Sequence, residues 1–216
     1  MTTKKLLLKT TIMCVGLLLT FSSCKKKEDT KAEDESGQAS TDSRQAISEN
    51  DNSITDINNT VKDYPLMHGR VSSSVQTNTI AGLSVDTNGA YMGTIKLNYD
   101  GVTVENNRKR SGSIRLTILN YASGQRWKNA GCVMKVEYLA YRVTRASDSQ
   151  FIELNGTQNL TNISGGTWWE LYTFAQSNLS SSVTGTNLSV NFNGGGTASY
   201  NINRKFTYTL NSTYVL

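Results

Sequence analysis

Paired carboxylates are the first candidate catalytic feature of this sequence. Glycoside hydrolysis needs two carboxyl groups about 5–10 Å apart. Glu137 and Glu153 lie in two strand-like segments joined by a polar turn at 146–149, so a hairpin would let them face each other. Ordinary cross-strand ion pairs with Lys135 or Arg142 explain the same carboxylates as well. The sequence therefore leaves a paired-carboxylate hydrolase open as the alternative interpretation.

Other catalytic and metal-binding patterns are missing from the sequence. It has no Gly-x-Ser-x-Gly, His-Glu-x-x-His or P-loop motif. The single histidine, His68, and the single cysteine beyond residue 24, Cys132, are too few for a zinc site. Cys132 lies in an apolar context and is expected to be a small buried residue, not a nucleophile. We expect no metal and no cofactor.

A basic cluster, Arg108, Lys109 and Arg110, is the first candidate for ligand binding. Residues 64–216 hold thirteen Lys and Arg against seven Asp and Glu. A basic hairpin suits an anionic glycan or phosphate group, and a solvated turn that protects a strand edge explains it too. No aromatic residue interleaves with the cluster, so nucleic acid is not an expected partner.

Trp168 and Trp169 are the second candidate. On the strand expected from residue 167 to about 177, adjacent side chains point to opposite faces. One tryptophan would then fill the core while the other could stack on a sugar ring. A purely structural role in the core explains them with fewer assumptions.

Cys24 indicates where the protein resides. Residues 1–23 have a lysine-containing start, an apolar middle and small residues at the end, which is typical of a secretory signal peptide. The apolar run is too short for a membrane-spanning helix. Phe21-Ser22-Ser23-Cys24 resembles a bacterial lipobox, whose cysteine is lipidated, commonly with palmitate. Lys25, which is not Asp, resembles the outer-membrane sorting pattern of bacterial lipoproteins, and this resemblance implies the outer membrane, on its periplasmic or its cell-surface face.

The chain beyond residue 23 divides into two parts. Residues 24–63 are polar, acidic and free of aromatics, which favours a disordered linker. Ile47, Ile54, Ile57 and Val61 have helix-like spacing, so a short helix near 44–62 is an alternative within it.

Residues 64–216 are expected to form a single β domain. Apolar and polar residues alternate in many segments, with Gly and Asn turns between them and no convincing helix beyond residue 90. Asn193-Gly194-Gly195-Gly196 is a strong hairpin signal. The pattern predicts an all-β antiparallel meander, forming either a sandwich or a curled sheet or partly closed barrel. Tyr214–Leu216 either pairs as an edge strand or marks a truncated C-terminus.

Part of this domain resembles a family of uncharacterised Bacteroidota lipoproteins, over about residues 93–166. The matching segments are Ile95-Lys96-Leu97-Asn98-Tyr99-Asp100-Gly101, Asn107-Arg108-Lys109-Arg110-Ser111-Gly112-Ser113-Ile114, Trp127-Lys128-Asn129-Ala130-Gly131, Leu154-Asn155-Gly156-Thr157 and Thr161-Asn162-Ile163-Ser164-Gly165-Gly166. The resemblance implies an all-β envelope lipoprotein and no particular activity. Family members carry further strands and cysteines beyond the part corresponding to Tyr208, which implies that this chain is truncated.

The sequence as a whole favours a non-enzymatic binding or structural module, held to the outer membrane by a lipid anchor at Cys24. Its expected partners are the membrane and either a glycan or an envelope protein. The alternative is an envelope polysaccharide hydrolase that uses Glu137 and Glu153.

Overall fold

A computed structural model describes residues 30–64, 67 and 80–209. The predicted signal peptide, the predicted lipidation residue Cys24, the single histidine His68 and the expected edge at Tyr214–Leu216 lie outside the described residues. Within the described part, no helix is long and apolar enough to cross a membrane.

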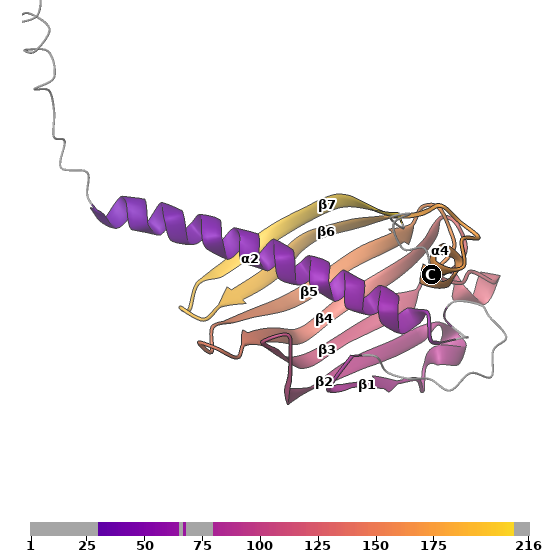
Figure 1. Ribbon diagram of the computed structural model, residues 1–216, viewed down its shortest axis with the longest axis horizontal. Coiled ribbons are helices and arrows are strands. Elements are labelled where there is room, and N and C mark those ends of the chain that lie inside the picture. The colour runs from indigo at the N-terminus through magenta and orange to yellow at the C-terminus, as the bar shows by residue number, and fades with distance from the viewer. Residues whose placement is uncertain (1–29, 65–66, 68–79, 210–216) are drawn as a thin grey trace, which may run out of the picture. The chain divides into compact units, whose positions relative to one another are not determined.

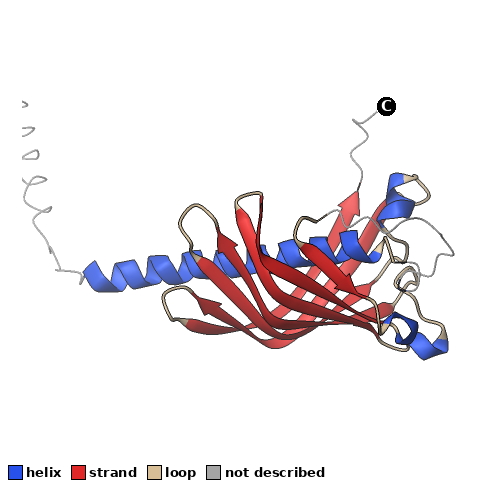
Figure 2. Ribbon diagram, turned by 90° about the horizontal axis from the view of Figure 1, so that it is seen from below, coloured by secondary structure: helices blue, strands red, loops and turns tan. Residues whose placement is uncertain are grey.

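The sheet is an antiparallel meander in which each strand pairs with its neighbours in sequence (Figure 1). The strands are β1 (Leu83–Asp86), β2 (Thr94–Glu105), β3 (Arg108–Ile118), β4 (Cys132–Arg145), β5 (Phe151–Asn162), β6 (Asn178–Phe192) and β7 (Thr197–Thr209). β1 and β7 are the two edges, so the sheet is not closed. The predicted all-β antiparallel meander is confirmed, and the sheet takes the curled, open arrangement (Figure 2).

Alternation of side chains sets the register of the strands. Ile95 and Leu97 in β2 are buried and pair with Leu116 and Ile114 in β3, while the residues between them are more exposed. A slip of one residue would turn each of these apolar side chains outward. The buried face of the sheet is therefore specified by the pattern from which the strands were predicted.

A line of β-bulges curves the sheet. The register shifts after Asp100 in β2, Ser111 in β3, Tyr138 in β4, Asn155 in β5 and Gly185 in β6. Each bulge contains a residue with positive φ: Gly101, Gly112, Ala140, Gly156 and Asn187. An extra residue bends a strand and increases its twist, so five adjacent bulges form a crease across the sheet.

Helix α2 (Thr30–Val61) packs on the concave face of the sheet from residue 42 onward. The contacts place Asp42–Leu216 in one compact unit, separate from Met1–Thr41. Ile54, Ile57 and Val61 are fully buried. A helix is therefore present in the region 44–62, where a short one was the alternative prediction, and it is longer than expected because it begins at Thr30. This part of α2 has the composition of a linker because the face that it buries against the sheet is largely polar.

The strand expected from residue 167 to about 177 is wrong. The structure has a short helix there, α4 (Trp168–Tyr172), and β6 begins only at Asn178. The backbone N–H and the hydroxyl of Thr167 both donate to Glu170 Oε2, at 2.8 and 2.5 Å. This Thr-x-x-Glu arrangement is a helix-starting capping motif, and it outweighs the β propensity of the two tryptophans.

Candidate functional site

The predicted carboxylate pair is not brought face to face. Register places Glu137 opposite Thr157 and Glu153 opposite Arg142. Glu137 lies 3.2 Å from Lys135 Nζ, and Glu153 lies 2.7 Å from Arg142 Nη2. The structural explanation, cross-strand and same-face ion pairing, accounts for both side chains.

Glu153 is also a poor general acid. Partial burial opposes its ionisation, but hydrogen bonds from Arg142, Asn155 and Asn191 outweigh burial and lower its pKa. A general acid in a hydrolase needs a raised pKa. The group is therefore held as an ionised hydrogen-bond acceptor.

The basic cluster is partly neutralised by α2. Arg108 Nε lies 3.2 Å from Glu49, and Arg110 Nε lies 3.3 Å from Asp56. Arg110 also binds Glu105 at 2.8 Å. Arg108 and Arg110, two of the three predicted binding cations, therefore join the helix to the sheet. Lys109 is the cation of the cluster that makes no ion pair with a described residue.

Asp56, the partner of Arg110 in α2, is a buried carboxylate with an altered pKa. Burial raises the pKa of Asp56 to about 6, against the opposing effect of the Arg110 charge. The oxygen Oδ2 of Asp56 makes no hydrogen bond among the described residues, and neither does the buried hydroxyl of Tyr99. Burial also raises the pKa of Tyr99.

A second buried network, which the sequence did not reveal, centres on Tyr138. Asn50 Nδ2 donates to the Tyr138 hydroxyl at 3.2 Å and to Gln158 Oε1 at 3.1 Å, and Gln158 Nε2 donates to the same hydroxyl at 2.8 Å. The Ser53 hydroxyl donates to the Asn50 carbonyl, so the Tyr138 hydroxyl donates to Ser53, at 2.6 Å. The network is satisfied internally and fixes the position of α2 on the sheet.

Trp168 belongs to an aromatic cluster at the end of the sheet. Its ring stacks on Tyr172 one turn later, with centroids 5.9 Å apart and planes 25° apart. The Tyr208 ring, from β7, lies 4.7 Å away at a tilted angle. Trp169 lies in the same helix, but its side chain is outside what the structure describes. The expected division of the tryptophans between two faces of a strand is therefore wrong.

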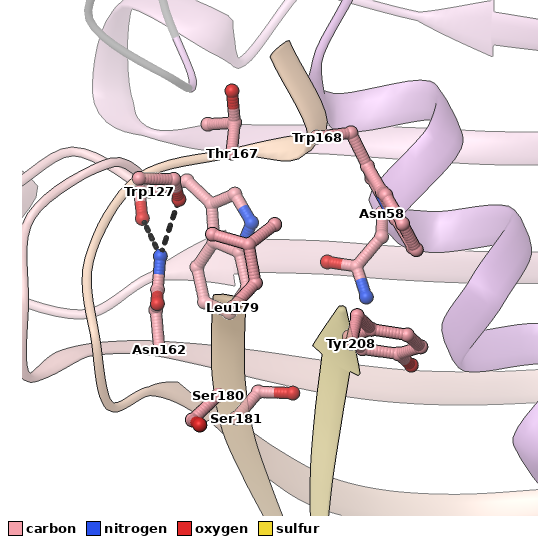
Figure 3. Close-up of a pocket in the computed structure, with 10 residues that line it drawn as sticks. Asn58, Trp127, Asn162, Thr167, Trp168, Leu179, Ser180, Ser181 and Tyr208 are labelled. Carbon is pink, nitrogen blue, oxygen red and sulfur yellow. Dashed lines mark hydrogen bonds between the residues drawn. The ribbon is translucent and has the colours of Figure 1, made fainter. Parts of the chain in front are cut away.

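Beside this aromatic cluster lies a small hollow of about 20 Å³, room for roughly one water-sized group. Figure 3 shows Asn58, Trp168 and Tyr208 on one side of it, and Trp127 with Leu179 on the other. The residues that line it are Asn58, Trp127, Asn162, Gly166, Thr167, Trp168, Leu179, Ser180, Ser181 and Tyr208.

Some polar groups that line the hollow make hydrogen bonds within the protein, and the Ser181 hydroxyl does not. The Asn162 amide donates to the carbonyls of Trp127 and Gly166, at 2.7 and 2.8 Å. The buried Ser181 hydroxyl has no hydrogen-bond partner among the described residues. Tyr172, at the outer side of the cluster, is 56% exposed. The Trp168 and Tyr208 rings and the Ser181 hydroxyl therefore line the same hollow, and Tyr172 extends the aromatic surface outward from Trp168.

Cys132 is buried, and it is the free thiol of the described residues. Desolvation raises its pKa to about 11. Its burial confirms the prediction of a small buried residue, and a thiol with so high a pKa is a weak nucleophile at neutral pH. Among the described residues, no group of three or more His, Cys, Asp or Glu could hold a metal ion.

Comparisons with protein-family models, with curated proteins and with solved structures found no match for this chain.

Proposed function

We propose that this chain is a lipid-anchored protein of the bacterial outer membrane whose β domain is a non-enzymatic, glycan-binding module. The anchor is assigned from the lipobox-like Phe21-Ser22-Ser23-Cys24. The ligand class is assigned from the site, since ring faces bind the apolar face of a sugar while hydroxyl groups bind its edge.

One observation carries the ligand assignment. Trp168, whose ring stacks on Tyr172, lines a hollow that also contains the Ser181 hydroxyl, for which the described residues offer no hydrogen-bond partner. A buried polar group without a partner costs about 1–3 kcal/mol, and a ligand that supplies the partner recovers that cost. The hollow is too small for a sugar ring but large enough for one hydroxyl group. We infer that a sugar stacks on the outer aromatic surface and inserts one hydroxyl toward Ser181.

Binding of residues 25–216 to a glycan array, followed by titration of the best ligand, tests this proposal. Tyr172→Ala is expected to weaken binding about two- to tenfold, because a stacked ring contributes roughly 0.5–1.5 kcal/mol. Tyr91→Ala is the matched control, since Tyr91 is also exposed and lies outside the cluster. Equal losses in both variants, or no glycan bound at all, would remove the sugar assignment.

Ser181→Ala separates a ligand role from a structural one. Removal of an unpaired buried hydroxyl is expected to leave the free protein equally or more stable. The same variant is expected to weaken glycan binding. A variant that binds as well as the wild type shows that the hydroxyl does not contact the ligand.

The lipid anchor is tested separately, with the full chain in a diderm bacterium. Metabolic labelling with a palmitate analogue is expected to label the wild type and Cys14→Ser but not Cys24→Ser. Label that persists in Cys24→Ser would contradict anchoring at this residue.

A further inference from the structure

A second, larger cavity lies between α2 and the last two strands, and the aromatic site does not use it. Its volume is about 170 Å³. It is lined by Ala46, Ile47, Asn50, Leu188, Val190, Tyr200, Asn201, Ile202, Asn203 and Arg204. An apolar cavity of about 150 Å³ in a protein interior is known to stay dry and to bind benzene. The space is therefore of the size that holds one small hydrocarbon group.

Two polar side chains of the lining, Asn50 from α2 and Arg204 from β7, are already engaged. The Asn50 amide donates both of its hydrogens, to Tyr138 and Gln158. Arg204 lies 2.5 Å from Asp51, and its guanidinium lies over the Phe206 ring at 5.3 Å. A charged ligand would find no uncompensated charge there, so the lining selects an uncharged, apolar group.

The cavity lies at the open side of the sheet. β7 is an edge strand. α2 contacts it through a hydrogen bond between Ser43 and Tyr200 and an ion pair between Asp51 and Arg204. Between these two contacts lies Ile47, a large apolar side chain that is 45% exposed. A ligand can therefore enter along the line where α2 and β7 meet, without opening the buried core.

We propose that this cavity, defined by Ala46, Ile47, Leu188, Val190 and Ile202, binds an uncharged hydrocarbon group of about the size of benzene. The group belongs either to an aromatic ring or to the end of an alkyl chain. Both present the same chemistry to the lining: apolar surface, no charge and no demand for a hydrogen bond. The site is distinct from the Trp168–Tyr172 cluster and does not depend on glycan binding there.

Solution NMR of residues 25–216 with methyl labelling tests the proposal with three probes: benzene, 1-hexanol and hexanoate. Benzene and hexanol are expected to give intermolecular NOEs to the Leu188 and Val190 methyl groups, and hexanoate is expected to bind at least tenfold more weakly. NOEs that are absent, or that spread over exposed methyl groups elsewhere, would overturn the proposal. Stronger binding of hexanoate would overturn the requirement for an uncharged ligand.

Longer probes distinguish the two sources of the hydrocarbon group. If the natural group is an alkyl chain that passes through the open side, affinity is expected to rise further from 1-hexanol to 1-decanol. If it is a ring, affinity is expected to be highest for benzene and to level off with chain length.

Cavity-filling variants provide the genetic test. Ala46→Leu is expected to lower benzene affinity at least tenfold, and Ala122→Leu, at an exposed position in η2 (Tyr121–Ser123), is the matched control. Ile202→Phe fills the cavity from the opposite wall in case Ala46→Leu fails to fold. Unchanged benzene affinity in both filled variants would overturn the assignment. Tyr172→Ala is expected to leave benzene binding intact, which separates this test from that of the glycan site.

Discussion

Asp56 makes the stability of this protein dependent on pH. Burial raises the pKa of its carboxyl group from 3.8 to about 6, so the folded state favours the protonated form more than the unfolded state does. The stabilisation that the protonated carboxyl gives the fold is complete below pH 3.8, the pKa in the unfolded chain. It is lost as the pH rises through about 6, the pKa in the fold. A shift of this size corresponds to about 1–3 kcal/mol. Charged groups of α2, β2 and β3 surround it: Glu49, Glu105, Arg108 and Arg110.

Urea denaturation of wild type and Asp56→Asn between pH 4 and 7 measures this effect. The unfolding free energy of the wild type is expected to fall over this range relative to the variant. Asp86→Asn, at an exposed position, is the control. Parallel pH profiles for wild type and Asp56→Asn would show that Asp56 is ionised in the fold without cost.

Cys132 is expected to be inert in the folded protein. The residue is 1% exposed, and desolvation raises the pKa of its thiol to about 11. Ellman's reagent at pH 8 is expected to leave it unmodified in buffer and to modify it fully in urea. Rapid modification without denaturant would mean that the end of β4 opens readily.

The crease across the sheet can be tested at two neighbouring bulges. A Cβ at Gly112 would lie 2.0 Å from the Ala140 carbonyl oxygen, so Gly112→Ala is expected to destabilise the fold by about 1–3 kcal/mol. Ala140 itself has φ of 49°, which costs an L-residue about 1 kcal/mol or more. Ala140→Gly is therefore expected to raise the unfolding free energy, by up to about 1 kcal/mol after the added entropy of glycine.

Gly194→Ala is the control for both substitutions, because a Cβ there meets no atom within 4 Å. Denaturant titration measures all three variants. A Gly112→Ala variant as stable as Gly194→Ala would mean that the bulges of β3 and β4 are not packed as described.

Helix α2 is expected to contribute to stability through one face only. Ile57 is fully buried while Ile47, on the same helix, is 45% exposed. Ile57→Ala is expected to cost about 2–4 kcal/mol, and Ile47→Ala less than about 1 kcal/mol. Equal effects in chemical denaturation would contradict the packing of α2 on the sheet.

Sequence reasoning succeeds for elements whose pattern is local and fails where partners are distant. Alternation in β2 and β3 predicted their buried faces, since each strand carries its own signal. The polar face of α2 could not be predicted, because Asn50 and Asp56 become interior residues only through Tyr138 and Arg110. For α4 a signal was present, the Thr167–Glu170 capping pair, and the tryptophans between them obscured it.

The same difference between local patterns and distant partners applies to the predicted sites. Ion pairing of Glu137 and Glu153 was foreseen as the alternative to catalysis, because cross-strand neighbours follow from a hairpin. The Trp168–Tyr208 contact required β7 to return beside α4, and only the sheet topology gives that.

At the scale of the whole molecule, the sheet and residues 42–61 are expected to fold as one unit. Burial of an aliphatic side chain contributes about 1.5–3 kcal/mol, so the three buried aliphatics of α2 contribute about 5–9 kcal/mol together. That is comparable to the total stability of a domain, about 5–15 kcal/mol. Loss of α2 would also leave the Tyr138 hydroxyl without Asn50 and Ser53, and Arg110 without Asp56. A sheet without this helix is therefore not expected to be stable.

Two fragments test this expectation, one beginning at residue 42 and one at residue 64. The longer fragment is expected to show dispersed NMR signals, near-ultraviolet circular dichroism and a cooperative unfolding transition. The shorter one is expected to lose these and to bind a hydrophobic dye, because the concave face of the sheet is left uncovered. Cooperative unfolding of the 64–216 fragment with the same midpoint would show that the sheet is stable alone and that α2 is an accessory to it.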